Sequence, residues 1–282
     1  MNRSMYAFKF AAGTIGIFLV LCAGGCQSEP SPDIPNVPAQ APQAFSNSDW
    51  AAFLSAAVTP DGYVRWDMVQ SNDSGVRRSL MNYIGLINAV SPDNHPDLFP
   101  SNNDRLAYWL NACNAMCVYA VIKNSYPPNL FTTPWPGSMF SQDQYTFGGD
   151  SMTLNQVVQK PLESFNDPRI FFALNFCAVS CAPLRSMPYD GAILDAQLED
   201  QGQRYLSDPR AAIRDGDAVK LNDLLAKMHE YDFLAGFKRT FGVAPTGLLQ
   251  ALQPYVQSDS PIVGATSVED MGFDWRLNRP PR

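Results

Sequence analysis

The run from residue 104 to residue 126, DRLAYWLNACNAMCVYAVIKNSY, constrains the fold more than any other part of the chain. It reads as one long helix that is apolar nearly all round, and it ends before Pro127-Pro128. A helix without a polar face is stable only when other elements surround it. We therefore expect this helix at the centre of the core, with the rest of the domain packed around it.

The elements around this helix are shorter and of both kinds. Apolar residues at helical spacing, preceded by capping residues, predict further helices, and β-rich runs beside turn residues predict strands. Helices outnumber strands and their order is mixed, so the predicted fold class is α+β, a helix-rich single domain with a small sheet. The predicted helices are 49–58, 74–90, from Ser151 or Thr153 to 159, 192–206, from Asn222 or Asp223 through 227 and onward, and 246–255; the predicted strands are 63–66, 144–147, a buried strand 169–176 and a hairpin 213–221.

The first 26 residues have the pattern of a secretory signal. Arg3 and Lys9 form a basic start, an uncharged apolar run covers residues 10–21, and Ala23-Gly24-Gly25 precedes Cys26. This pattern resembles the lipobox of bacterial lipoproteins, with alanine where leucine is commoner, and it predicts a diacylglycerol thioether on Cys26. The alternative is an uncleaved membrane anchor, but the apolar run is shorter than the roughly 20 residues that span a bilayer.

The sequence then divides into three parts. We predict a signal peptide over residues 1–25, a lipidated cysteine and Pro-rich linker over 26–47, and a globular domain over 48–282. The linker contains little to bury and is expected to be extended. Gln27, in place of aspartate, resembles lipoproteins sorted to the outer membrane. We therefore expect a protein of the cell envelope, lipid-anchored in the outer membrane and facing the periplasm, with an envelope protein or peptide as a further partner.

The charge balance excludes one class of partner. The chain has 27 acidic and 20 basic residues, a net charge of −7, and no run or stripe of Lys and Arg. A basic footprint is the usual signature of nucleic-acid binding, so no nucleic acid is expected. The same balance argues against electrostatic docking on anionic lipid, which leaves membrane attachment to the acyl chains. The acidity itself indicates an ordinary solvated surface.

Four cysteines remain after Cys22 leaves with the signal and Cys26 is lipidated. Cys113, Cys117, Cys177 and Cys181 form two Cys-x3-Cys pairs, and in an oxidising compartment an even number predicts disulfides. The first pair lies on one helix and cannot easily bond within itself, so bridges to the second pair are expected. A loop bridge within the second pair, free buried thiols, and a four-cysteine zinc or iron–sulfur site are the alternatives. We expect neither a metal nor another cofactor.

Candidates for nucleophilic catalysis are few. Cys181 follows the predicted buried strand, and a thiol in such a place needs a base, usually histidine. His95 lies in a polar loop, which leaves His229, near the end of a predicted helix, as the candidate base. The sequence contains no glycine-rich phosphate loop, no His-Glu-x-x-His and no Gly-x-Ser-x-Gly.

Asn111 and Asn114 are the polar exceptions in the central helix. They lie three residues apart and therefore share a face. Buried amides need hydrogen-bond partners. Two interpretations are open: an internal network that locks the helix to its neighbours, or a pair that orients a loop backbone or a ligand.

Three separate segments resemble the family catalogued as domain of unknown function 547. They are RLAYWLNACNAM (105–116), DPRIFFALNFCAVSCAPL (167–184) and FDWRLN (273–278). The resemblance implies one domain that spans nearly the whole mature chain, and bacterial members of the family are often exported. It implies no particular reaction.

The chain also departs from the family pattern. Val158 and Gln159 stand where relatives carry Glu-His, Phe171 where they carry His, and Phe176 where their first strand-end cysteine falls. A metal or catalytic site at those positions would be lost here. We therefore predict a non-catalytic binding or scaffolding domain; the alternative is a thiol-dependent hydrolase or transferase acting on peptide or cell-wall material, with Cys181 as nucleophile. The residues left as a candidate pocket are Asn111, Asn114, Arg169, Asn175, Ser180 and Cys181.

Overall fold

A computed structural model describes residues 42–71, 75–132, 137–227 and 233–281 of the chain. The predicted signal peptide, Cys26, most of the linker and His229 lie outside these residues. The structure is helix-rich with two small sheets, as the α+β prediction required. No helix of the described part is both long and apolar enough to cross a membrane.

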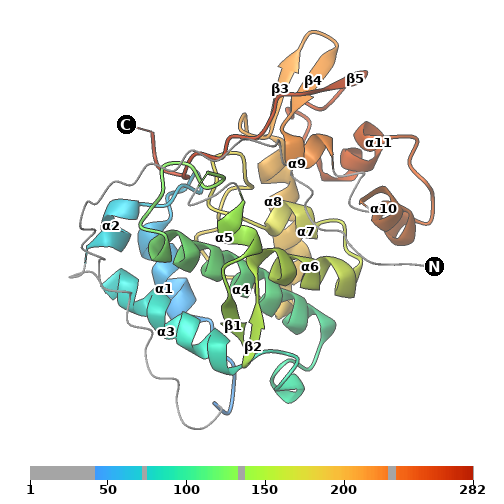
Figure 1. Cartoon of the computed structure of the whole chain (residues 1–282). Coiled ribbons are helices and arrows are strands. Elements are labelled where there is room, and N and C mark those ends of the chain that lie inside the picture. Colours follow the sequence, from blue (N-terminus) through green and yellow to red (C-terminus); the bar gives the residue numbers. More distant parts are fainter. Residues whose placement is uncertain (1–41, 72–74, 133–136, 228–232, 282) are drawn as a thin grey trace, which may run out of the picture.

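The predicted central helix is α4 (Asn102–Lys123), which runs through the middle of the molecule (Figure 1). Every residue from Leu106 to Ile122 is buried, as its lack of a polar face required. The helix begins two residues before Asp104 because Ser101 and Asp104 form a reciprocal capping box at its first turn. Helices α3 (Gly75–Ala89) and α6 (Leu154–Phe165) pack against it.

The N-terminal helices cover one side of α4. Helix α1 (Ser48–Ala57) buries Trp50, Phe53 and Leu54, and it packs mainly against α3. The strand predicted over 63–66 is wrong: Val64 forms a single bridge with Val58, and α2 (Trp66–Gln70) begins directly afterwards. The short 3-10 turn η1 (Pro96–Leu98) lies in the polar connection between α3 and α4.

A small hairpin precedes α6. Strands β1 (Tyr145–Phe147) and β2 (Asp150–Met152) pair antiparallel around Gly148-Gly149, after the four-residue helix α5 (Ser138–Ser141). Both glycines have positive φ, which matches the turn predicted there. Thr153 caps α6 with Gln156 in a second capping box, and α6 continues to Phe165, six residues beyond the predicted end.

The buried strand predicted over 169–176 is wrong. Residues Ile170–Ala173 form the one-turn helix α7, and an extended segment follows. Asp167 turns the chain there, because its carboxylate accepts the Arg169 N–H. Among the described residues no strand pairs with the segment; the Asn175 N–H donates to the side chain of Asn114 instead. The β-rich apolar composition therefore reflected burial rather than pairing.

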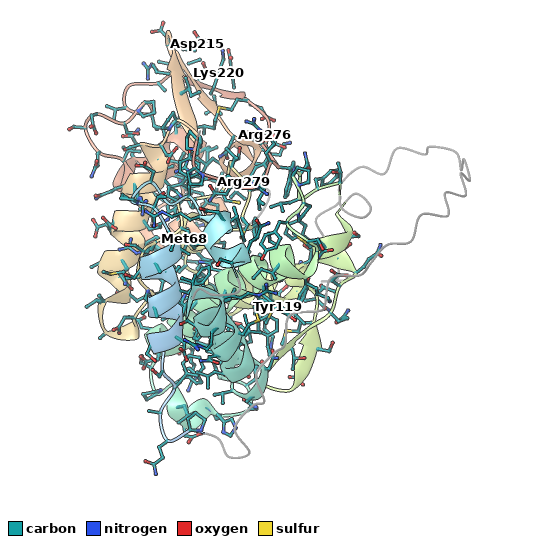
Figure 2. All side chains as sticks on the ribbon, turned by 90° about the vertical axis from the view of Figure 1, so that its left-hand side faces the viewer. Met68, Tyr119, Asp215, Lys220, Arg276 and Arg279 are labelled. Carbon is teal, nitrogen blue, oxygen red and sulfur yellow. The ribbon has the colours of Figure 1, made fainter. Side chains whose placement is uncertain are left out.

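The C-terminal part forms a second, smaller hydrophobic cluster against the first. Strand β3 (Ala212–Asp215) pairs antiparallel with β4 (Ala218–Leu221), the predicted hairpin, and β4 pairs parallel with β5 (Ser267–Asp270). Figure 2 shows the Asp215–Lys220 ion pair at the projecting end of this sheet. The helices here are η2 (Gly191–Ile193), α8 (Leu194–Leu206), α9 (Asp223–Ala226), α10 (Phe233–Phe241), α11 (Leu248–Leu252) and η4 (Gln253–Tyr255).

The final segment joins parts of the chain that are far apart in sequence. The Leu130 N–H donates to the Trp275 carbonyl, and the Val179 N–H donates to the Arg276 carbonyl. The Asn278 N–H donates to the Cys177 carbonyl at 2.7 Å. The segment FDWRLN therefore lies beside the loop that carries Cys177.

Candidate functional site

A small pocket lies between α1, α4 and the loop that precedes η2. Its volume is about 220 Å³, including space open to solvent. Two predicted residues, Asn111 and Asn114, line it from α4. The other lining residues are Trp50 and Leu54 of α1, Ala173 of α7, and Pro183, Leu184, Arg185, Met187 and Tyr189 of the loop.

Asn111 holds one wall of this pocket. Its Nδ2 donates to the Tyr189 carbonyl at 2.8 Å, and its Oδ1 accepts the Tyr189 N–H at 2.9 Å. The side-chain amide thus pairs with the backbone of Tyr189 as a neighbouring strand would. Both groups are buried, so the pairing fixes the end of the loop to α4.

Asn114 holds the opposite side in the same manner. Its Nδ2 donates to the Ala173 carbonyl at 3.0 Å, and its Oδ1 accepts the Asn175 N–H at 2.8 Å. Both asparagines therefore form an internal network that orients loop backbone. Because their amides are committed to backbone groups, they supply the walls of the pocket rather than free donors.

The remaining predicted pocket residues lie elsewhere. Asn175 is buried behind the pocket, where it accepts the Cys177 N–H and donates to the Ala182 carbonyl. Ser180 accepts the Asp274 N–H and so fastens the C-terminal segment. Arg169 pairs with Asp167 and with Asp195 of α8. The structure thus brings Asn111 and Asn114 together but does not bring these three into the same pocket.

Sequence reasoning missed Arg185, the only cation among the pocket-lining residues of the described chain. Its side chain is 15 % exposed, and its Nη1 pairs with Asp200 at 2.5 Å. Its guanidinium lies 5.9 Å from the centre of the Tyr189 ring. The one signal in the sequence was its place directly after Cys-Ala-Pro-Leu at the end of the second family-like segment.

The disulfide prediction is wrong. Cys113, Cys117, Cys177 and Cys181 are all free thiols and all buried. The Cys113 thiol donates to the Val157 carbonyl at 3.3 Å, and Cys181 Sγ accepts the Phe176 N–H at 3.3 Å. All four thiols pack as core side chains. An even number of cysteines, read together with an expected oxidising compartment, does not reveal this packing. Within the described part of the chain, no cluster of three or more His, Cys, Asp or Glu is placed to hold a metal.

The chemistry of Cys181 follows from its burial. Burial raises the pKa of the Cys181 thiol to about 11, and two backbone hydrogen bonds and the charge of Arg210 only partly oppose that rise. At neutral pH the thiol is therefore protonated, whereas a nucleophile needs the thiolate. Cys177, four residues earlier, has a left-handed backbone with φ 62°, held by the hydrogen bond from its N–H to Asn175, and burial raises its pKa as well.

One family model matches this chain. It is described as a protein of unknown function, DUF547, and it covers residues 99–206. The match supports this domain family for the segment that contains α4, α6, α7 and α8, and thus for the first two family-like segments of the sequence. No curated protein and no solved structure matches the chain. All of the pocket except Trp50 and Leu54 lies inside the matched segment.

Proposed function

We propose that this protein is a lipid-anchored component of the cell envelope whose globular domain binds a partner without catalysing a reaction. One observation carries the non-catalytic role: the predicted nucleophile, Cys181, is a buried, hydrogen-bonded and protonated thiol. The predicted anchor is Cys26, and the Pro-rich residues after it connect the anchor to the domain.

The pocket supports a binding role. Asn111 and Asn114 fix its walls to the central helix, so its shape is present before any ligand arrives. A preorganised site loses little conformational entropy on binding. The 220 Å³ includes space that is open to solvent, and nearly all of the lining side chains are buried, so the pocket admits only a small group at its mouth.

The anchor is tested by metabolic labelling. The full chain is expressed in a bacterial host with an alkyne fatty acid, and the membrane fraction is probed for label. Label is expected on the intact chain and on the Cys22→Ala variant, because Cys22 leaves with the signal peptide, but not on Cys26→Ala. Equal labelling of Cys26→Ala would refute the anchor.

The non-catalytic role is tested by thiol reactivity. The native protein is treated with iodoacetamide at neutral pH, and the modified cysteines are identified by mass spectrometry. All four domain cysteines are expected to react only after denaturation. Selective modification of Cys181 in the native protein, faster than that of Cys113, would favour the thiol-dependent hydrolase or transferase instead.

A further inference from the structure

The loop between α10 and α11 exposes apolar side chains. Val243 is 61 % exposed, more than any other large apolar side chain of the described residues, and Phe241 is 43 % exposed. Ala244, next to Val243, is exposed as well. Figure 1 shows this loop at the outer edge of the molecule, where it connects the two helices. We call residues 241–245, FGVAP, the apolar tip. Apolar side chains gathered on a surface mark a place of interaction.

The apolar tip is held in place where it leaves α10. The Phe241 ring packs against the rings of Phe237 and Tyr255, with centroid distances of 4.5 Å and 6.3 Å. Phe237 and Tyr255 are buried, so Phe241 is attached to the core although part of its ring reaches solvent. Gly242 ends the helix with φ 76°, and its N–H donates to a carbonyl of the last turn at 2.9 Å. The left-handed glycine turns the chain out of the helix, and Val243 follows it into solvent.

Two cations stand beside the apolar tip. Lys238 and Arg239 occupy the last turn of α10, both are exposed, and neither side chain forms an ion pair or hydrogen bond with another described residue. Other lysines, such as Lys160 and Lys220, pair with an aspartate. The stretch 233–258 contains no Asp or Glu, so these two cations are its only charges. The chain as a whole has a net charge of −7, but this stretch is positive.

An apolar tip with cations beside it fits the surface of a bilayer that contains anionic lipid. Apolar side chains are stabilised where the headgroups meet the acyl chains, and neighbouring Lys and Arg side chains reach the lipid phosphates. A second copy of this chain is a poorer occupant, because a symmetric contact would bring the same cations of both copies together. The negative charge of the whole chain opposes a general attraction to such lipid, which confines the contact to this stretch.

The predicted anchor keeps a bilayer within reach. Residues 27–41 lie between Cys26 and Pro42, the first described residue. A chain extends by at most about 3.6 Å per residue, so the tether from Cys26 to Pro42 spans at most roughly 55 Å. A domain of this size has a radius of gyration of roughly 18 Å, so such a tether is long enough for any side of the domain to face the membrane. Tethering also raises the effective concentration of lipid at the tip, so a contact that is weak on its own becomes populated.

We propose that the apolar tip inserts into the membrane that holds the anchor, with its apolar side chains among the outer acyl carbons and with Lys238 and Arg239 on the phosphates of anionic phospholipid. The inference rests on the proposed lipid anchor and adds a second point of attachment. A single tether leaves the orientation of the domain free, whereas two points of attachment fix which side of the domain faces the bilayer.

The test measures the depth of the apolar tip in a bilayer. Val243→Cys is made in the full-length, lipidated protein, labelled with a nitrobenzoxadiazole dye and inserted into preformed vesicles of phosphatidylcholine and phosphatidylglycerol. Part of the lipid carries a nitroxide on its acyl chain, which quenches only dye that lies close to it. Because the native domain thiols are buried, the new cysteine is the expected site of labelling. Ser151→Cys, exposed on β2 and far from α10 in Figure 1, is the matched control.

The position of the dye decides the outcome. The dye at residue 243 is expected to shift its emission to shorter wavelength and to lose most of its fluorescence to the nitroxide, whereas the dye at residue 151 is expected to change in neither respect. Equal quenching at the two positions overturns the proposal. A blue shift at residue 243 without quenching overturns it as well, because the tip is then covered by protein, such as a second copy of the chain.

Charge variants test the role of the two cations. Lys238→Gln combined with Arg239→Gln is expected to lower the ratio of inserted to free tip at least about fivefold, since each cation near anionic lipid contributes roughly that factor. Arg276→Gln combined with Arg279→Gln changes the net charge equally. These two arginines, labelled in Figure 2, lie near the C-terminal end, which is far from α10 in Figure 1, so the ratio is expected to stay unchanged. Equal losses in the two double variants, or no loss in either, overturn the proposal.

The two proposals fail in different ways. If Cys26 is not lipidated, the fatty-acid labelling fails and the protein does not enter the vesicles through its anchor, which rejects both proposals. If Cys26 is lipidated and the dye at residue 243 stays unquenched, only the second point of attachment is rejected, and the lipid anchor stands.

Discussion

Replacing Asn114 by alanine is expected to destabilise the fold far more than the loss of so small a side chain would suggest. The substitution removes two hydrogen bonds to buried backbone groups, the Ala173 carbonyl and the Asn175 N–H. A buried polar group left without a partner costs about 1–3 kcal/mol. Two such groups give an expected loss of about 2–6 kcal/mol. Because Asn114 lines the pocket, a water that enters the vacated space brings the loss toward the lower value.

The assay is urea unfolding followed by far-ultraviolet circular dichroism. Total stabilities of domains are commonly about 5–15 kcal/mol, so the expected loss shifts the midpoint clearly, and an unchanged slope shows that the comparison is valid. Asn102→Ala is the matched control, since Asn102 is exposed at the start of the same helix. It is expected to change stability by less than about 0.5 kcal/mol. Equal effects of the two variants would refute the assignment of Asn114 as a buried partner for backbone.

Three further predictions test the N-terminal cap of α4, the close contact at Gly191 and the buried thiol of Cys181. Ser101→Ala breaks the capping box of α4 and is expected to cost about 1 kcal/mol in urea unfolding; no loss would show that Asp104 alone satisfies the helix end. Gly191→Ala places a Cβ 2.1 Å from Asp104 Oδ1 and is expected to cost about 1–3 kcal/mol. In Gly75→Ala of α3 the Cβ meets only the end of the Arg78 side chain, at 3.5 Å, so this variant is expected to be neutral or stabilising; thermal unfolding compares the two. Burial raises the pKa of Cys181 to about 11, above the unfolded value of about 8.5, so the unfolded chain loses a proton that the folded chain keeps and stability falls as pH rises from about 9 to 11. The midpoint measured over that range is expected to fall less in Cys181→Ala, and an identical fall would contradict a protonated native thiol.

The features that could be predicted from sequence are those in which local pattern and burial agree. A helix that is apolar on all sides is stable only inside the core, so the sequence of residues 104–126 predicts a central helix. The corresponding helix, α4, does lie at the centre. The hairpin around Gly148-Gly149 was likewise set by turn residues that tolerate positive φ. The segment 169–176 shows the opposite case. Its composition fits a strand, but strand formation needs a neighbour, and the neighbour in the fold is an asparagine side chain.

The site was predictable only in part for a related reason. Two asparagines at helical spacing in an apolar helix stand out in any sequence, and both prove to be pocket walls. Arg185 carries no such mark. Arg169 and Arg210 each pair with an aspartate two residues away, whereas Arg185 pairs with Asp200 of α8, and only the folded loop brings those two together. The four cysteines mislead in another way: their number is even, but their environment is that of core residues.

The asparagines connect the stability of the core to the shape of the pocket. Tyr189 and Ala173 line the pocket, and each is held to α4 by a side-chain amide rather than by a sheet or a disulfide. Loosening either amide therefore frees a pocket wall. Asn111→Ala is therefore expected to loosen the loop backbone at Tyr189, which is measured as faster amide hydrogen exchange there than in the intact chain. Unchanged hydrogen exchange at Tyr189 in a variant of lower stability would show that the loop holds its shape without α4.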